Sequence, residues 1–370
     1  MADNKDKKVL NVPALRFPEF TGEWKRHKLS EVCSFYSGGT PSSSKKEYYN
    51  GDIPFIRSGE LHKDNTELFI TEDGLNNSAA KMVEVGDLLL ALYGATSGDI
   101  AISKIKGAIN QAILCIRTKQ NKKFIESVWN KHVERLLQTY LQGGQGNLSA
   151  DIVKNIPFYF ASCAEQDKLA QFVSLLDERI ATQNKIIEKL QSLIKGIIET
   201  VISSQKPNTF IKNCLECDSS TLQESQVAEN GAYPVYGATG ISGYTETADV
   251  NGEAILITKD GSGVGTVKFA DGEYSYIGTL NRLIAREGYC LKYLYFALQG
   301  FCFEPYKTGM AIPHIYFKDY GKAKIFCPTI EEQSIIAKSL SVIENKISVE
   351  KQILFCNQLQ KSYLLSQMLI

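Results

Sequence analysis

Several short motifs resemble parts of catalytic sites, and each lacks the partners that such chemistry needs. Gly261-Ser-Gly-Val-Gly265 has the glycine content of a phosphate-binding loop, but Val267-Lys-Phe269 continues as a strand. A nucleotide-binding loop leads into a helix, so we interpret this motif as a β-turn. Asn155-Ile-Pro-Phe158 has Ile where the adenine methyltransferase motif has Pro, and no cofactor-binding glycine motif precedes it. It predicts the start of a strand.

The cysteines and histidines lack the spacing of metal ligands. Cys214-Leu-Glu-Cys217 has neither a second pair nor two histidines near it, as a zinc site requires. Nine irregularly spaced cysteines indicate reduced thiols rather than disulfides. The four histidines share no spacing and are interpreted as structural. Since no Gly-x-x-x-x-Gly-Lys-Ser/Thr loop and no hydrolase set of acids is present either, we predict no catalytic centre, no metal and no cofactor on this chain.

Size and charge limit the classes of function. The chain has 370 residues, 44% of them hydrophobic, and a formal net charge of zero, which suits two domains with real cores. Most isolated DNA-binding domains are basic. Neutral charge therefore counts against strong DNA binding by the chain alone, but less against base reading inside a larger complex. Residues 1–8 have no apolar run behind them, so we expect no signal peptide. No stretch approaches the roughly 18 apolar residues that a membrane-spanning helix needs, so we expect no membrane span and a cytoplasmic protein.

The elements that must position any functional loop are repeated along the chain. Glu165-Gln166 and Glu332-Gln333 each open a long helical pattern, at an offset of 167 from residue 165 to residue 332. The preceding segments also resemble one another, in three pairs whose offsets are 180, 166 and 171: Gly51–Ile56 with Gly231–Tyr236, Gly86–Leu89 with Gly252–Ile255, and Asn110-Gln111 with Asn281-Arg282. Similar frames with loops of different length suit two domains that recognise different targets.

Both helical patterns place apolar residues in steps of three and four, which is typical of a coiled coil. The predicted seam contains Val173, Leu176, Ile180, Ile187, Leu190, Ile194, Ile197 and Val201 in the first helix, and Leu340, Ile343, Ile347, Leu354 and Leu364 in the second. Gln183 and its mate Glu350 interrupt the two seams. Such polar residues either fix the register of the helices or occupy a tolerated, partly wet surface position. The second seam, also broken by Asn357 and Lys361, needs the first helix or a partner protein to cover it.

The globular parts are rich in Gly, aromatic and β-branched residues. Short apolar runs such as Asp87–Leu92 and Ala254–Thr258 predict strands bounded by turns.

In this order, the residues resemble a known family. Leu15-Arg-Phe-Pro-Glu-Phe20 with Trp24, then Gly38-Gly-Thr-Pro41, resembles the N-terminal part of the specificity (S) subunits of Type I restriction-modification systems. The two Glu-Gln motifs before long helices, and Tyr233–Tyr244, are also similar to that family. The resemblance runs from about Leu15 to Ile370, although the second domain lacks a Trp-led start near Asn208.

The resemblance implies an α+β fold, in which two mixed α/β target recognition domains alternate with two long helices. The helices would pack as an antiparallel coiled coil, and the internal repeat would be pseudo-twofold. We predict an N-terminal arm at 1–24, recognition domains at 25–160 and 206–328, and spacer helices at 161–205 and 329–370. A helix of about 38 residues is roughly 57 Å long, whereas one turn of B-DNA spans about 34–36 Å. The resemblance thus implies a bipartite, non-palindromic DNA site with an unread gap.

Reading bases in the major groove requires side chains with paired donors and acceptors, on loops where glycine allows close approach. In the first domain the candidates are Lys45, Lys46, Arg57, Tyr93, Thr96, Ser97, Asn110 and Gln111. In the second they are Tyr236, Thr239, Lys259, Ser262, Asn281, Arg282, Tyr306, Lys307 and His314. The alternative for each is an ordinary solvated side chain, and the glycines themselves serve turns.

The resemblance also implies which chemistry belongs to other chains. Two methyltransferase subunits would dock on the helical seam and its flanks, and restriction subunits would join through them. Adenine methylation, ATP hydrolysis and cleavage, with S-adenosylmethionine, ATP and magnesium, would reside in those partners. Two alternatives remain: a stand-alone DNA methyltransferase, which should bind S-adenosylmethionine by itself, and a coiled-coil scaffold with two domains that do not bind DNA.

Overall fold

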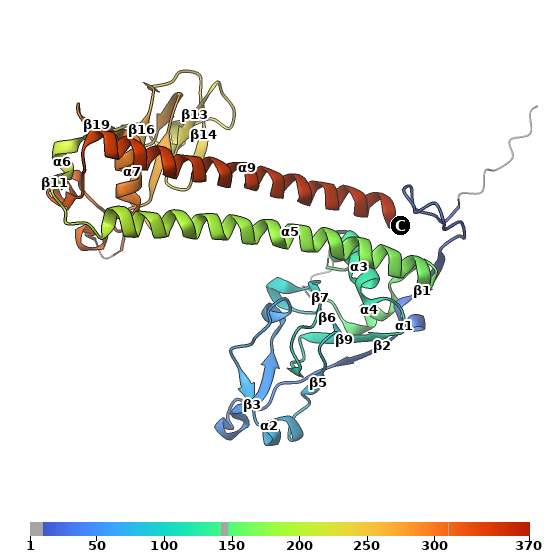
Figure 1. Ribbon diagram of the computed structural model, residues 1–370. Helices are drawn as coiled ribbons and strands as arrows, with labels where there is room; N and C mark the ends of the chain where they lie inside the picture. Colours follow the sequence, from blue (N-terminus) through green and yellow to red (C-terminus); the bar gives the residue numbers. More distant parts are fainter. Residues whose placement is uncertain (1–9, 142–146, 310) are drawn as a thin grey trace, which may run out of the picture. The chain divides into compact units, whose positions relative to one another are not determined.

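The computed structural model describes residues 10–141, 147–309 and 311–370. The expectation about a signal peptide concerns residues 1–8 and lies outside them. The chain forms two compact units, one of residues up to Thr182 with Leu354–Ile370, and one of Gln183–Ile353. Each unit holds one α/β domain and portions of two long helices (Figure 1). Within the described ranges, no helix is both long and apolar enough to cross a membrane.

The first unit begins with the strands and helices of one domain. Its elements are β1 (Lys25–Lys28), α1 (Leu29–Val32), β2 (Cys33–Ser37), β3 (Tyr49–Ile56), β4 (Phe69–Ile70), α2 (Glu72–Asn76), β5 (Lys81–Val83), β6 (Leu88–Ala91), β7 (Ile100–Ile102), β8 (Gly107–Ile109), β9 (Ile113–Thr118), α3 (Lys122–Leu141), α4 (Ala150–Asn155) and β10 (Pro157–Phe160). The long helix α5 (Cys163–Ile197) follows and ends in a π-helical segment, Ile198–Ser203.

The second unit has a matching series. Its elements are β11 (Thr209–Phe210), α6 (Ile211–Cys214), β12 (Leu215–Ser219), β13 (Tyr233–Tyr236), β14 (Ile241–Thr245), β15 (Val250–Asn251), β16 (Ala254–Thr258), β17 (Val267–Ala270), β18 (Glu273–Tyr276), β19 (Leu280–Ala285), α7 (Leu291–Gln299), α8 (Phe317–Tyr320), β20 (Lys324–Ile325) and the long helix α9 (Ile330–Met368). The strands predicted at 87–92 and 254–258 are confirmed as β6 and β16.

Both domains have the same sheet topology. In the first, one sheet has the order β2-β9-β6-β7 and the other β4-β3-β8-β5. In the second, the corresponding orders are β12-β19-β16-β17 and β14-β13-β18-β15. Among the described strands, a parallel pair falls at the same place in each domain, between β3 and β8 and between β13 and β18. The internal repeat predicted from the sequence is therefore a repeat of the whole domain frame.

Strand register identifies equivalent residues. Leu88 pairs with Ile116 in the first domain and Ile255 with Leu283 in the second, so equivalent residues lie 167 positions apart. The parallel pairs begin at Phe55 and at Val235, 180 positions apart, which confirms the predicted match of Gly51–Ile56 with Gly231–Tyr236.

The predicted match of Asn110-Gln111 with Asn281-Arg282 is wrong. Asn281 pairs with Ile257 inside the sheet, and the residue with that place in the first domain is Leu114, which pairs with Leu90. Asn110 instead lies in the turn before β9. Local similarity of amide side chains suggested the match, whereas the hydrogen-bonded register determines the true one.

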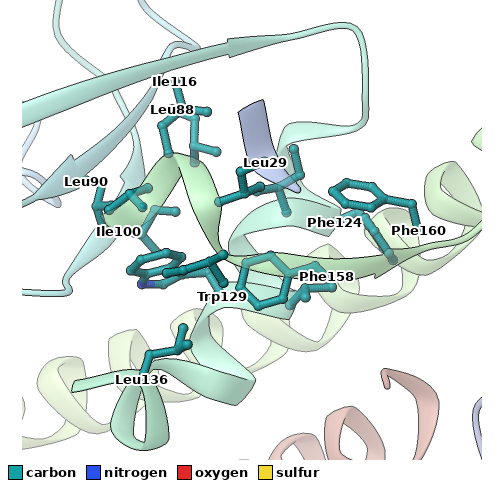
Figure 2. Packing of buried hydrophobic residues seen from close by; sticks show 14 of the residues in the cluster. Leu29, Leu88, Leu90, Ile100, Ile116, Phe124, Trp129, Leu136, Phe158 and Phe160 are labelled. Carbon is teal, nitrogen blue, oxygen red and sulfur yellow. The ribbon is translucent and has the colours of Figure 1, made fainter. Parts of the chain in front are cut away.

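The core of the first domain forms where one face of the β2-β9-β6-β7 sheet meets α3. Leu88, Leu90 and Ile116 project from this face because alternate residues of a strand point the same way. Figure 2 shows them with Leu29, Ile100, Phe124, Trp129, Leu136, Phe158 and Phe160. Trp129 is fully buried, and its Nε1 donates to the Gly98 carbonyl at 2.7 Å. Each such side chain contributes about 1.5–3 kcal/mol, which fixes α3 on the sheet.

Within the second unit, the end of α5 packs antiparallel to the start of α9. Gln183 contacts Glu350, whereas Ile198 and Ile202 share a core with Ala337 and Leu340, so residue numbers rise along one helix as they fall along the other. Within the first unit, Asp177 of α5 forms an ion pair with Lys361 of α9. Three of the four predicted breaks, Gln183, Glu350 and Lys361, thus form polar contacts between the helices.

The predicted seam residues are buried or half-buried with one exception. Val173, Ile187, Leu340 and Ile347 are buried, and the half-buried ones are Leu176, Ile180, Leu190, Ile194, Ile197, Ile343, Leu354 and Leu364. Val201 is 39% exposed, and the buried positions there are Ile198 and Ile202. A π-helical turn contains one residue more than an α-helical turn, so the segment Ile198–Ser203 shifts the seam by one residue.

Candidate nucleic-acid interface

Candidates in the two domains occupy equivalent loops, β6–β7 and β16–β17. In the first, the Gly98 N–H donates to the Ala91 carbonyl at 2.9 Å, and in the second the Gly265 N–H donates to Thr258 at 2.9 Å. Both glycines have φ near +90°, at +88° and +89°, which side chains rarely tolerate. These loops hold the candidates Tyr93, Thr96 and Ser97 in one domain and Lys259 and Ser262 in the other.

The structure brings several second-domain candidates together around His314. The His314 ring Nδ1 lies 2.7 Å from Asp260 Oδ1, next to Lys259. The Gly261 N–H donates to the Pro313 carbonyl at 3.0 Å, which ties the loop of Ser262 to the same strip. Backbone bonds between His314 and Thr308 bring Lys307 and Tyr306 alongside. Ser262 is exposed, and Lys307 and His314 are half-buried, so this strip offers hydroxyl, ammonium and imidazole groups along one surface.

Asn281 and Arg282 lie in strand β19 rather than in a loop. Asn281 is only 4% exposed, accepts from the Ser219 hydroxyl at 3.0 Å and lies 3.4 Å from the Tyr320 hydroxyl. Arg282 is half-buried and donates from Nη1 to Asp218 at 3.0 Å. The amide of Asn281 is thereby engaged inside the domain, whereas Arg282 keeps part of its guanidinium at the surface.

Arg57 is held by carboxylates of its own domain. Its Nη2 donates to Glu60 at 2.9 Å and to Glu67 at 2.9 Å, and its Nε donates to Glu60 at 3.2 Å. Glu60 is 3% exposed. Burial alone would raise its pKa, but hydrogen bonds from Arg57 and Thr66 lower the pKa of Glu60 to about 2. This arrangement makes Arg57 an anchor of the loop after β3.

The remaining first-domain candidates surround the segment after β2. Lys45 and Lys46 are both exposed, and Lys45 donates to the Tyr48 hydroxyl at 2.8 Å. Gln111 is exposed, and its Oε1 accepts from Thr40 at 2.6 Å. Asn110 is half-buried, and its Oδ1 accepts from the Ala112 N–H at 3.1 Å, as in an Asx-turn. The contact with Thr40 brings Gln111 beside the glycine-rich start of this segment.

The β13–β14 turn presents Thr239 and depends on a lysine that the sequence analysis missed. Tyr236 packs edge-to-face on Tyr274 with ring centroids 5.4 Å apart, and Thr239 is exposed in the turn. Lys268 of β17 donates to the carbonyls of Ala238 at 2.8 Å and Gly237 at 3.3 Å. Burial lowers the pKa of Lys268. The sequence did contain an indication of this role, because Lys268 lies between Val267 and Phe269 and therefore on the opposite face of the strand.

The Cys-Leu-Glu-Cys motif contributes to the core of the second domain. Cys214 and Cys327 are both buried in it, while Cys217 only packs against it from a half-buried position. Hydrogen bonding with Cys327 and burial raise the pKa of the Cys214 thiol. A neutral, packed thiol is a poor metal ligand, and among the described residues no group of three or more His, Cys, Asp or Glu could hold a metal ion.

The chain matches the model of the Type I restriction modification DNA specificity domain twice, over residues 21–192 and 215–355. The chain belongs to this family. Each match contains one recognition-domain frame and most of the long helix that follows it, so the family match and the repeated topology describe the same duplication.

Relatives with curated names are also specificity subunits. The chain is 22% identical to the Escherichia coli Type I restriction enzyme EcoprrI specificity subunit over 352 residues, covering 84% of this chain and 85% of that one. It is 27% identical to the E. coli EcoR124I/EcoR124II specificity subunit, over 48% of this chain and 45% of the relative. The match to the Methanocaldococcus jannaschii MjaIX specificity subunit, at 28% identity, covers 42% of that protein. The chain thus spans about half the length of these last two relatives.

Solved structures share the fold. The Type I restriction-modification S subunit from M. genitalium matches with a TM-score of 0.65 at 16% identity, over 97% of this chain and 99% of that chain. A chain from a study of complex assembly in a type I R-M system matches with a TM-score of 0.56 at 15% identity, over 93% of this chain and 97% of that chain. The predicted α+β fold with two recognition domains and long helices is confirmed.

Proposed function

We propose that this chain is the DNA specificity subunit of a Type I restriction-modification complex. It reads a bipartite, non-palindromic site, one half with each recognition domain, and carries no catalytic centre of its own. The observation that carries the proposal is the duplicated domain frame in a chain of this family, with different side chains on equivalent loops. Since a shared frame with divergent loops recognises two unlike half-sites, the target would lack the symmetry of a palindrome. DNA binding also supports a cytoplasmic location.

The accessibility of the candidates supports a narrower set of base-reading residues. We assign this role to loop side chains that are exposed or half-buried: Lys46, Tyr93, Thr96 and Gln111 in the first domain, and Thr239, Lys259, Ser262 and His314 in the second. Ser97, which donates to the Leu92 carbonyl, and Lys307, which pairs with Glu304, lie beside them. Arg282, Tyr306 and Tyr236 lie beside the second set. Lys45 and Arg57 are exposed, but they bond to Tyr48 and to Glu60 of their own domain, and Asn110 and Asn281 are also bonded within their domains. We assign these four residues a role in shaping the loops.

We further propose that methyltransferase subunits, two per chain, dock on the long helices, with restriction subunits joining them. Helix α9 carries exposed Ile335, Val342, Val349, Cys356 and Tyr363 at intervals of seven residues. A row with this period lies along one face of a helix, outside the seam, and suits packing by further helices. S-adenosylmethionine, ATP and magnesium would be bound by the partners.

Co-expression of the chain with its methyltransferase subunit, followed by methylation mapping of the host genome, tests the proposal. We expect adenine methylation at one split motif that disappears when this chain is omitted. Methylation that is independent of the chain, or at a palindromic motif, overturns the proposal. Calorimetry of the chain alone with S-adenosylmethionine tests the alternative of a stand-alone methyltransferase, which would bind this cofactor by itself. Failure to co-purify any methyltransferase subunit would favour the scaffold.

A further inference from the structure

The glutamine of each Glu-Gln motif makes the same pair of contacts in the two units. Gln166 accepts from the Asn121 N–H at 3.1 Å and donates to the Ala161 carbonyl at 2.8 Å. Gln333 accepts from the Cys290 N–H at 3.0 Å and donates to the Pro328 carbonyl at 2.9 Å. Both glutamines are almost fully buried, at 1% and 2% exposure. Each therefore joins the N-terminus of the domain helix, α3 or α7, to the start of the long helix.

An ion pair is repeated eleven residues further along each long helix. Lys123 of α3 lies 2.8 Å from Asp177 of α5, and Lys292 of α7 lies 2.8 Å from Glu344 of α9. Asp177 and Glu344 are 167 positions apart, the offset that relates the two domains. All four side chains are between 25% and 33% exposed. Eleven residues are about three turns along the long helix. On the domain side, the two contacts lie two residues apart, at Asn121 and Lys123 or at Cys290 and Lys292.

We propose that these two points form a clamp that fixes the orientation of each recognition domain on the long helix that follows it. A single contact would allow the domain to rotate about that contact. A second contact, which reaches the long helix three turns further on, restricts this rotation. In each unit the clamp holds the first turn of the helix that directly follows β9 or β19, so it acts on the recognition sheet itself. Figure 1 shows α7 beside the beginning of α9.

The effect of the clamp on DNA recognition rests on the proposed function. If the domains read two half-sites, then their orientation on the helices determines which gap between the half-sites fits. The clamp residues do not touch DNA in this proposal and act as positioning residues. Their loss should therefore leave the letters of each half-site unchanged and relax the length of the gap.

The test uses the full complex, assembled with methyltransferase subunits, on DNA with the native gap and with gaps one base pair longer and shorter. Clamp variants are Gln166→Ala with Asp177→Asn, and Gln333→Ala with Glu344→Gln. The two acids become amides so that their neighbours keep a hydrogen-bond acceptor. Matched controls on the same helices are Gln171→Ala with Glu178→Gln, and Gln352→Ala with Glu331→Gln, all exposed.

We expect each clamp variant to lower the preference for the native gap by about tenfold, the scale of one or two lost hydrogen bonds to a charged or buried group. The controls should keep the preference of the wild type. An unchanged preference in both clamp variants overturns the clamp. A wild-type complex that methylates no split site instead overturns the proposed function, so the two failures are distinguishable.

Amide exchange separates a loosened clamp from an unfolded domain. In a loosened clamp, the amides of Asn121 or Cys290 exchange faster while those of β9 or β19 stay protected. If a double variant unfolds, Gln333→Glu replaces it, since this change keeps the acceptor for Cys290 and puts an acceptor in place of the donor to Pro328. The clamp then predicts a smaller loss of gap preference with normal protection of β19, and no loss at all contradicts it.

Discussion

Gln183 and Glu350 occupy equivalent positions of the repeat, 167 residues apart, and they contact each other in the buried seam. Gln183 Nε2 donates to the Glu350 carbonyl at 3.2 Å and also to its carboxylate, which Lys346 approaches to 2.5 Å. Both side chains are more than 90% buried. The alternative of a wet surface position is therefore wrong, and a role in fixing the register of the helices remains our interpretation.

This contact predicts a difference between single and double substitutions. Gln183→Leu alone should lower the melting temperature, by about 2–4 °C, because it places an apolar residue beside the Glu350 carboxylate and leaves it with Lys346 but without the Gln183 donor. Adding Glu350→Leu should restore or raise the melting temperature, since an apolar pair packs well in a seam. Thermal unfolding by circular dichroism measures both. A double variant less stable than the single one would contradict the argument.

The Arg57–Glu60 pair predicts an acid-dependent stability without a role in base reading. The folded pKa of Glu60 is about 2, against 4.5 for an ordinary glutamate. A depressed carboxyl pKa stabilises the fold fully above about pH 4.5, and this contribution is lost as the pH falls toward 2. Glu60→Gln should destabilise the first domain by about 1–3 kcal/mol at pH 7 and flatten its stability between pH 4.5 and 2. Urea titrations over this range provide the measurement.

The same pair offers a control for DNA recognition. Glu60→Gln and Arg57→Met should leave both half-sites unchanged in methylation maps, because the guanidinium is bound to carboxylates of its own domain. A change in the first half-site after Arg57→Met would show that Arg57 reads a base and would return it to the interface.

The burial and the hydrogen bond of Trp129 predict that substitutions at this position strongly lower the stability of the first domain. Trp129→Phe removes the hydrogen bond to Gly98 and should cost about 1–3 kcal/mol. Trp129→Ala also leaves a cavity and should cost about 3–5 kcal/mol. Trp24, the only other tryptophan and 2% exposed, still reports on the same core by fluorescence during urea unfolding. Tyr93→Ala, at an exposed loop position, is the control and should be nearly neutral.

Periodicity and repetition made much of the fold predictable. Burial requires apolar residues at regular positions, and this requirement is visible in the sequence. It made three features predictable: the steps of three and four in the long helices, the strands at Asp87–Leu92 and Ala254–Thr258, and the repeat at an offset of 167. The exposure of Val201 was not predicted, because the spacing of apolar residues does not reveal the π-helical segment Ile198–Ser203. The helices α3 and α7 were not expected, since both lie in segments rich in aromatic and β-branched residues.

Contacts between residues distant in sequence made the site harder to predict. Glu165 and Glu332 are identical in motif, yet Glu165 binds Arg16 with two hydrogen bonds of 2.7 Å whereas Glu332 accepts from Thr329. Asn281 looked free to read a base because Ser219 and Tyr320, its partners, lie 62 and 39 residues away. Sequence indicates which side chains can bind, but the fold decides which are already engaged.

Lys259 provides a direct test of base reading in the second domain. Its Nζ lies 3.4 Å from the Ser219 hydroxyl, beside the strip around His314. Lys259→Ala should relax one position of one half-site, at a cost of about 1–3 kcal/mol in discrimination, and leave the other half-site intact. Asn281→Ala, which is buried nearby, should lower stability instead. Methylation maps and melting curves of both variants separate the two roles, and two unchanged half-sites after Lys259→Ala would remove this residue from the interface.

The neutral charge of the chain predicts how DNA binding depends on its partners. With 41 basic and 41 acidic residues, the chain alone brings no net positive charge to the phosphates. Each phosphate contact contributes about 0.9 to the slope of log K against log salt. Fluorescence anisotropy with a DNA carrying the split site should therefore give a shallow slope and weak binding for the chain alone, and a steeper slope with tighter binding for the methyltransferase complex. A chain that binds this DNA as tightly and with as steep a slope by itself would show that its own surface, rather than that of its partners, holds the backbone.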